Sequence, residues 1–118
     1  MKVMIPLDEE RRDVCVSFGR APFFLIYDTG SGLSECLPNP AAEASGGAGI
    51  QAAQFVVDRG ADVLITIRCG ENAAEVFKAA GMRILKALQG SAEANLEAFR
   101  AGTLEPLTRF HAGFHGVK

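Results

Sequence analysis

The feature that most limits the fold of this chain is an uninterrupted apolar run, Val-Leu-Ile-Thr-Ile, at residues 63–67. A strand with one face in water alternates apolar and polar residues, and this run shows no alternation. It therefore predicts a central strand that is covered on both faces. Strands of this kind occur in parallel sheets, where helices form the right-handed crossovers, so the run indicates an α/β fold.

Helical patterns lie on either side of this run. Apolar side chains recur at helical spacing over residues 48–59 and again over residues 71–80, and each pattern ends at a glycine. Residues 82–87 form a further short strand. Ser91 can cap a third helix that closes at Gly102. From residue 48 onward, the order predicts two strand–helix repeats with parallel strands.

The first part of the chain predicts antiparallel pairing instead. Residues 2–7 and 23–27 are short apolar strands, and a turn at residues 29–32 leads into a third strand over residues 33–37. We therefore expect a mixed sheet with helices on its faces, in a single domain covering residues 1–118. Residues 103–118 lack periodicity and predict a loosely ordered tail.

Composition excludes several classes of partner. A formal net charge of −2 gives no broad attraction for nucleic acids or acidic membranes. No apolar run approaches the ~20 residues that cross a bilayer. The cysteines at positions 15, 36 and 69 form no CxxC pair and fit reduced thiols. With an N-terminus unlike a signal peptide, these features predict a cytoplasmic protein.

A glycine-rich loop at the start of the first predicted helix is the best candidate for a binding site. Its residues are Ser45, Gly46, Gly47, Ala48 and Gly49. Glycines let backbone N–H groups approach a ligand, and the N-terminus of a helix favours anions. The loop matches neither the dinucleotide fingerprint nor the Walker phosphate loop, so it indicates an anion without identifying one.

Ligands of such sheets bind beyond the carboxyl ends of the parallel strands. If the strands at residues 2–7 and 63–67 are neighbours, four reactive or charged side chains converge near the glycine loop. They are Cys15, Arg20, Arg68 and Cys69.

Each candidate side chain has a plain structural alternative. Cys69 lies where a helix dipole and Arg68 stabilise a thiolate, which suits soft metals, yet free cysteines are commonly buried apolar residues. Cys15 carries the same ambiguity. Arg20 can bind an anion through its planar fork or form a surface ion pair with Asp8, Asp13 or Glu43. Asn72 can hydrogen-bond a ligand or satisfy backbone donors near a helix start.

Catalytic patterns are poor in this sequence. It contains no nucleophile elbow and no HExxH helix. A two-metal nuclease needs clustered acids, and the positions of Asp28 before a turn and Asp62 before a strand predict that both lie away from Asp8. His111 and His115 alone do not complete a metal's coordination shell, so a solvated tail is the preferred interpretation of their segment.

Five short motifs occur in order, at residues 5–8, 18–24, 39–40, 46–53 and 70–73. Together they resemble the dinitrogenase iron–molybdenum cofactor-binding family, which includes NifX, NafY and the C-terminal part of NifB. The resemblance extends over nearly the whole chain. It implies a ribonuclease-H-like α/β fold with a mixed five-stranded sheet and flanking helices. It also implies binding or carriage of molybdenum- or iron-containing sulfide clusters rather than catalysis.

The resemblance includes small stand-alone members such as the orange protein, which carries a molybdenum–copper sulfide cluster. It therefore implies a molybdenum-containing sulfide cluster, of Mo–Cu or Fe–Mo type, and a partner protein in its delivery or assembly. Such clusters are anionic, in agreement with the glycine loop and Arg20.

The chain departs from the family at two positions. Many relatives have His where this chain has Ser17 and Ser45, which removes two possible nitrogen ligands. Cys69 or Cys15 can substitute, or charge and backbone hydrogen bonds can hold the cluster alone. The alternative function is a protein-interaction or regulatory domain that has lost cluster binding.

Overall fold

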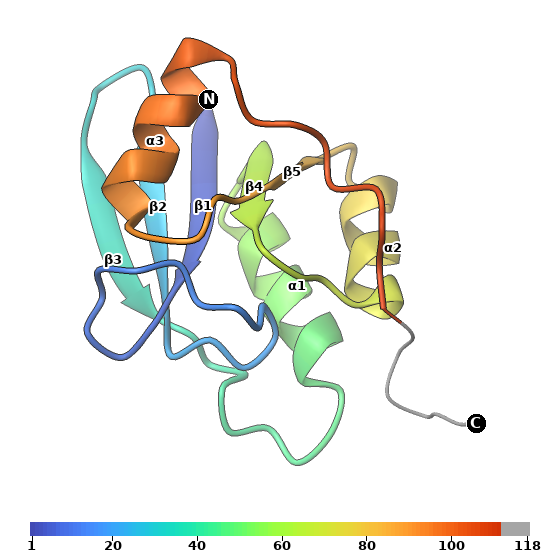
Figure 1. The fold of residues 1–118 in the computed structure, drawn as a ribbon. Helices are drawn as coiled ribbons and strands as arrows, with labels where there is room; N and C mark the ends of the chain where they lie inside the picture. The colour runs from blue at the N-terminus through green and yellow to red at the C-terminus, as the bar shows by residue number, and fades with distance from the viewer. Residues whose placement is uncertain (112–118) are drawn as a thin grey trace.

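The uninterrupted apolar run forms strand β4 (Val63–Thr66), and all of its residues are buried, as the sequence predicts. β4 pairs in parallel with β1 (Lys2–Leu7) on one side and with β5 (Arg83–Lys86) on the other. Strands β2 (Phe23–Asp28) and β3 (Ser34–Pro38) extend the sheet beyond β1 in antiparallel pairing. The resulting strand order is β3-β2-β1-β4-β5 (Figure 1).

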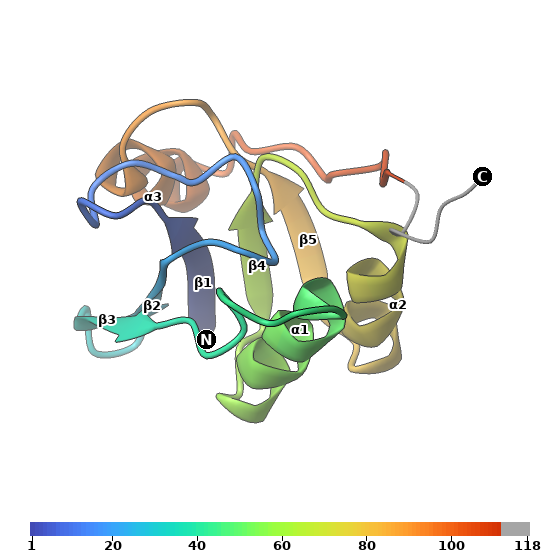
Figure 2. The same cartoon turned by 90° about the horizontal axis from the view of Figure 1, so that it is seen from below.

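The computed structural model describes residues 1–111, and in this part of the chain three helices cover the sheet. α1 (Ala48–Asp58) and α2 (Glu71–Ala79) lie side by side on one face, and α3 (Ala92–Ala101) lies on the other (Figure 2). The chain is therefore a single α/β domain with a mixed five-stranded sheet. The predicted early hairpin and the later parallel strands are both confirmed.

Alternation along the strands divides the core into two apolar layers, because successive residues point to opposite faces of a sheet. Met4 and Leu64 pack against α1 and α2, where Phe77 is fully buried. Val63 packs on the other face, together with Leu96 of α3. Both α1 and α2 return antiparallel to the strands that follow them. Their N-termini therefore lie beyond the carboxyl ends of β1 and β4.

Local sequence signals locate the element ends well. No predicted boundary of a strand or of the first two helices differs from the observed one by more than a single residue. Ser91 caps α3 as predicted, because its hydroxyl accepts a 3.0 Å hydrogen bond from the Ala94 N–H. Gly102 ends the same helix in the left-handed conformation. Among the described residues, no helix has both the length and the apolar character needed to span a membrane.

The prediction of a loosely ordered tail from residue 103 is wrong for residues 103–111, here named the C-terminal segment. The Leu107 N–H donates to the Ile84 carbonyl at 2.9 Å, and the Lys86 N–H donates to the Glu105 carbonyl at 2.7 Å. The segment therefore runs along the outer edge of β5. It lacks helical periodicity because it is extended and paired. The remainder of the predicted tail, including His115, lies outside the described residues.

Candidate anion-binding site

A pocket of about 460 Å³ opens at the carboxyl end of the parallel strands. Its walls come from the segment after β1, the glycine loop, the start of α2 and the end of the C-terminal segment. The lining residues are Ser17, Phe18, Gly19, Arg20, Ser45, Gly46, Gly47, Ala48, Gly49, Ile50, Gly70, Asn72, Ala73 and His111. β1 and β4 are neighbours, which is the condition that the sequence-based prediction of this site required.

The first wall of the pocket is the N-terminus of α1. Its N-cap, Gly47, adopts a left-handed conformation with φ 69°, which glycine tolerates without strain. This residue makes no side-chain cap, and the first turn contains no acidic residue. The N–H groups of Ala48, Gly49 and Ile50 precede the first possible helical hydrogen bond. The helix therefore presents backbone donors and the positive end of its dipole to the pocket.

The second wall is the segment after β1, which approaches α1 very closely at Gly19. A Cβ atom on Gly19 would lie 3.0 Å from both the Cα and the N atom of Gly49, too close for any other residue without movement of the backbone. Phe18 anchors this segment in the core, with its ring centroid 5.5 Å from that of Phe24 and 5.3 Å from that of Phe77. The Phe-Gly pair thus holds one side of the pocket against α1.

Asn39 joins the segment after β1 to the start of the loop that leads to α1, a role that the sequence did not reveal. The side chain is almost fully buried, and its Nδ2 donates to the carbonyls of Gly19 at 3.0 Å and Ala21 at 2.8 Å. Its Oδ1 accepts from the Ala41 N–H at 2.9 Å. Residues 39–40 are one of the five sequence motifs, but the backbone groups that Asn39 binds lie up to twenty residues away.

Arg20 lines the pocket and holds the loop that leads to α1. Its Nη1 donates to the carbonyl oxygens of Ala44 at 2.8 Å and Ala42 at 3.3 Å. The predicted alternative, an ion pair with a nearby carboxylate, is not among the ion pairs of the described residues. Both bonds come from Nη1, so neither of them uses the N–H donors on Nε and Nη2. Arg20 therefore adds fixed positive charge to the pocket.

The third wall is the N-terminus of α2. Its N-cap, Gly70, makes no side-chain cap. Asn72 lies near the helix start, as predicted, and lines the pocket. Two helix N-termini with glycine N-caps therefore open on the same space. Glu71 in the first turn of α2 offsets part of that helix's dipole, but its side chain does not line the pocket. The α1 dipole and the charge of Arg20 therefore make the pocket suited to an anion.

The cysteines do not join this arrangement. Cys69 is 1% exposed and packs in the apolar layer under α1 and α2, and neither it nor Cys15 lines the pocket. Burial raises the pKa of the Cys69 thiol to about 12, so the predicted stabilisation of its thiolate by the helix dipole and Arg68 is wrong. The structure supports the packing interpretation of Cys69. Metal ligation by Cys69 or Cys15 stays a prediction.

His111 is the lining residue that the sequence assigned to a solvated tail. Its backbone N–H donates to the Cys69 carbonyl at 3.3 Å, and its carbonyl accepts from the Glu71 N–H at 2.9 Å. These bonds hold the residue beside Gly70 at the start of α2. No local signal identifies this position, because the pairing joins segments about forty residues apart.

The three aspartates considered for a nuclease site lie at opposite ends of β1. Asp8 follows the carboxyl end of this strand. Asp28 is paired with Lys2 at the amino end, and Asp62 Oδ2 accepts from the Lys2 N–H at 2.9 Å. The prediction that Asp28 and Asp62 lie away from Asp8 is confirmed. Within residues 1–111, no group of three or more His, Cys, Asp or Glu side chains is arranged to hold a metal ion.

Fold and site together define an α/β domain whose pocket is lined by two helix N-termini, a glycine loop and an arginine. The model of the dinitrogenase iron-molybdenum cofactor family matches residues 1–102. The chain belongs to this family.

Solved structures agree with this assignment. The chain is similar to the apo form of the orange protein from Desulfovibrio gigas, with 27% sequence identity, a TM-score of 0.83, and coverage of 91% of this chain and 92% of that one. It is 38% identical to a putative NifB protein from Thermotoga, with a TM-score of 0.78 and coverage of 92% and 95%. A putative dinitrogenase from Methanocaldococcus jannaschii, at 20% identity and a TM-score of 0.72 over 92% and 96% of the two chains, supports the fold alone. No functionally curated protein matches the chain significantly.

Proposed function

We propose that this chain binds and carries an anionic metal–sulfide cluster as cargo and does not catalyse a reaction. The observation that carries the proposal is the convergence of the N-termini of α1 and α2 with Arg20 on one pocket. Family membership supplies the class of anion, a molybdenum-containing sulfide cluster of the Mo–Cu or the Fe–Mo type.

The chemistry of the pocket fits an anionic cluster better than a bare metal ion. No carboxylate is among the described residues that line it. A hard cation prefers carboxylate and carbonyl oxygens, and this pocket offers mainly backbone N–H groups and a guanidinium. Its volume of about 460 Å³ lies within the range of small-molecule sites. Backbone hydrogen bonds and charge would therefore hold the cluster, while sulfide already bound to the metals replaces the thiolates that the pocket lacks.

The proposal has further parts. Family membership favours a ribonuclease-H-like classification of the fold and a partner protein in cluster delivery or assembly. The three free cysteines favour a cytoplasmic location. A carrier has to release its cargo, and ligation through hydrogen bonds is more readily reversed than ligation through several thiolates.

Reconstitution tests the function directly. Apo-protein is incubated anaerobically with tetrathiomolybdate and copper(I), or with tetrathiomolybdate and iron(II), and then desalted. We expect a coloured complex with a fixed ratio of metal to protein by elemental analysis. The variant Arg20→Ala should retain less cluster, whereas Arg100→Ala, which removes an arginine that bonds to the Tyr27 hydroxyl, should retain as much as the wild type. A colourless wild-type eluate contradicts the proposal.

A second function is favoured by Ser17 and Ser45. Both line the pocket, and the family resemblance implies His at these positions in many relatives, so this pocket offers two hydroxyl groups in place of two nitrogen donors. The second candidate is therefore a protein-interaction or regulatory domain of the same fold. It predicts that one specific partner is recovered equally well by metal-free and by cluster-loaded protein, in a pull-down performed with both.

A further inference from the structure

We propose that the imidazole of His111 contacts the bound anion, which makes the C-terminal segment a part of the binding site. The inference rests on the proposed function and extends it to a residue outside the span that the family model matches, residues 1–102. The inference follows from the position of His111, the last described residue of the C-terminal segment, which lines the pocket.

The route of the segment fixes His111 in place. After α3, the chain crosses the sheet, follows the edge of β5 and reaches the start of α2 (Figure 1). Backbone hydrogen bonds then join His111 to the residues on both sides of Gly70, at 3.3 Å to the Cys69 carbonyl and at 2.9 Å from the Glu71 N–H. A residue bound in this way has a defined backbone position relative to the α2 N-terminus.

Gly70 gives the imidazole room at the pocket wall. A Cβ atom on Gly70 would lie 3.1 Å from Cε1, 3.6 Å from Nε2 and 3.7 Å from Nδ1 of His111. The ring therefore lies directly against the N-cap of α2. Gly70 has φ −77° and ψ 159°, a conformation that any residue adopts, so its backbone geometry does not require glycine. The contact with the ring is what an added methyl group would disturb.

The chemistry of imidazole differs from that of the rest of the lining. Ser17 and Ser45 offer hydroxyl groups, and the helix N-termini offer backbone N–H groups. An imidazole can donate a hydrogen bond to a sulfide, and it is also a good ligand for copper or iron. Among the described lining residues, His111 alone has this second ability. Ser17 and Ser45 line the same pocket without offering a nitrogen donor. His111 therefore supplies one from the C-terminal segment.

Binding measurements on His111 variants test the inference. Dissociation constants are measured anaerobically for tetrathiomolybdate alone and for tetrathiomolybdate with copper(I). We expect His111→Ala to weaken binding about tenfold, as loss of one hydrogen bond to a charged group does. Thr108→Ala, a control on the same segment that does not line this pocket, should stay within about twofold of the wild type.

Two further variants separate the contact from an effect on folding. Gly70→Ala keeps the imidazole but displaces it, so we expect weaker binding with an unchanged circular dichroism spectrum. His111→Gln retains a hydrogen-bond donor but is a poor ligand for copper. If it restores binding of tetrathiomolybdate alone, His111 donates a hydrogen bond, and if it fails only with copper(I) present, His111 is a metal ligand.

The outcomes distinguish this inference from the function on which it rests. In the wild type, the His111 ring nitrogen signals in ¹⁵N NMR should shift when tetrathiomolybdate is added. Folded His111→Ala that binds both probes as tightly as the wild type overturns the inference and leaves the proposed function in place. A wild-type protein that binds neither probe overturns both.

Discussion

The N-termini of α1 and α3 differ in whether side chains satisfy their first backbone N–H groups. α3 is closed by its own side chains, because Ser91 caps it and Glu93 lies in its first turn. α1 begins at Gly47, which makes no side-chain cap, and its first turn has no acid. A missing cap costs about 1 kcal/mol of stability. The start of α1 lies at the pocket, so a ligand can satisfy its backbone donors. The start of α3 does not line that pocket, and its own side chain satisfies a donor instead.

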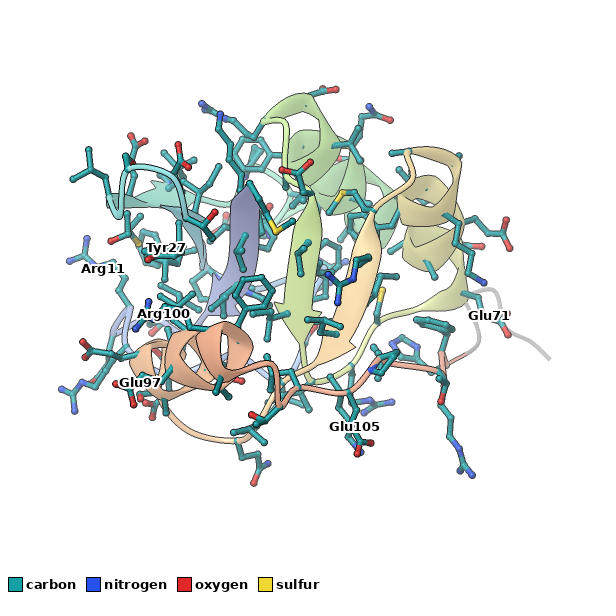
Figure 3. All side chains as sticks on the ribbon, turned by 90° about the horizontal axis from the view of Figure 1, so that it is seen from above. Arg11, Tyr27, Glu71, Glu97, Arg100 and Glu105 are labelled. Carbon is teal, nitrogen blue, oxygen red and sulfur yellow. The ribbon has the colours of Figure 1, made fainter. Side chains whose placement is uncertain are left out.

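The two helices also differ in their surroundings. The start of α1 opens on the pocket, together with Arg20 and the start of α2. Figure 3 shows Arg100 of α3 beside Tyr27, on the opposite side of the molecule from Glu71 at the start of α2. Arg100 on α3 donates a 3.2 Å hydrogen bond to the Tyr27 hydroxyl at the surface, whereas Arg20 binds the backbone of the loop that leads into the pocket.

Placing an acid just before the N-cap of α1 should produce the largest effect. Ser45→Asp places a carboxylate at the pocket mouth near the α1 N-terminus. Repulsion of about 2 kcal/mol from an anionic ligand corresponds to about thirtyfold weaker binding of tetrathiomolybdate. The same carboxylate should raise the stability of the ligand-free protein by about 0.5 kcal/mol, measured by urea unfolding, because it interacts with the helix dipole. Ser45→Asn is the neutral control, and equal affinity of the two variants would contradict the anion site.

The Cys69 thiol, just before α2, tests whether the helix dipole or burial controls the pKa of a group at a helix start. Burial raises the pKa of Cys69 to about 12, so the unfolded chain loses this proton first as the pH rises. Stability should therefore fall above the unfolded pKa of about 8.5, by about 2 kcal/mol between pH 8.5 and pH 10. Cys69→Ala should lack this component, so the difference in unfolding free energy between wild type and variant should shrink over that range. A constant difference would mean that the thiol titrates normally in the folded protein.

Removing the cap of α3 should produce the smallest effect. Ser91→Ala leaves the Ala94 N–H without its side-chain acceptor, and we expect a loss of about 1 kcal/mol in the free energy of unfolding. Cluster retention should not change, because Ser91 lies outside the pocket. If Ser91→Ala loses cluster but not stability, Ser91 acts in binding and is not only a structural cap of α3.

Local patterns in the sequence were sufficient for the elements and for part of the site. The run at residues 63–67 predicted a buried strand, and the glycine loop predicted the open start of α1. The position of Arg20 at the pocket followed from the rule that ligands lie beyond the carboxyl ends of parallel strands.

The remainder of the site depends on contacts between distant segments. Asn39 binds the carbonyl of Gly19, and His111 pairs with Gly70 across about forty residues, so no pattern within either segment shows the contact. The error at Cys69 has the same origin. Its chain neighbours suggested a stabilised thiolate, but the apolar side chains that surround it come from helices and strands elsewhere in the chain.

The C-terminal segment also determines how exposed the sheet is to other chains. An open strand edge presents a row of unpaired N–H and C=O groups, which is a template for aggregation. The segment satisfies part of that row on β5 through hydrogen bonds from Leu107 and to Glu105. The opposite edge, β3, is short and ends at Pro38, which cannot donate a hydrogen bond to an incoming strand. The same segment that brings His111 to the pocket thus also protects the sheet from pairing with a neighbouring molecule.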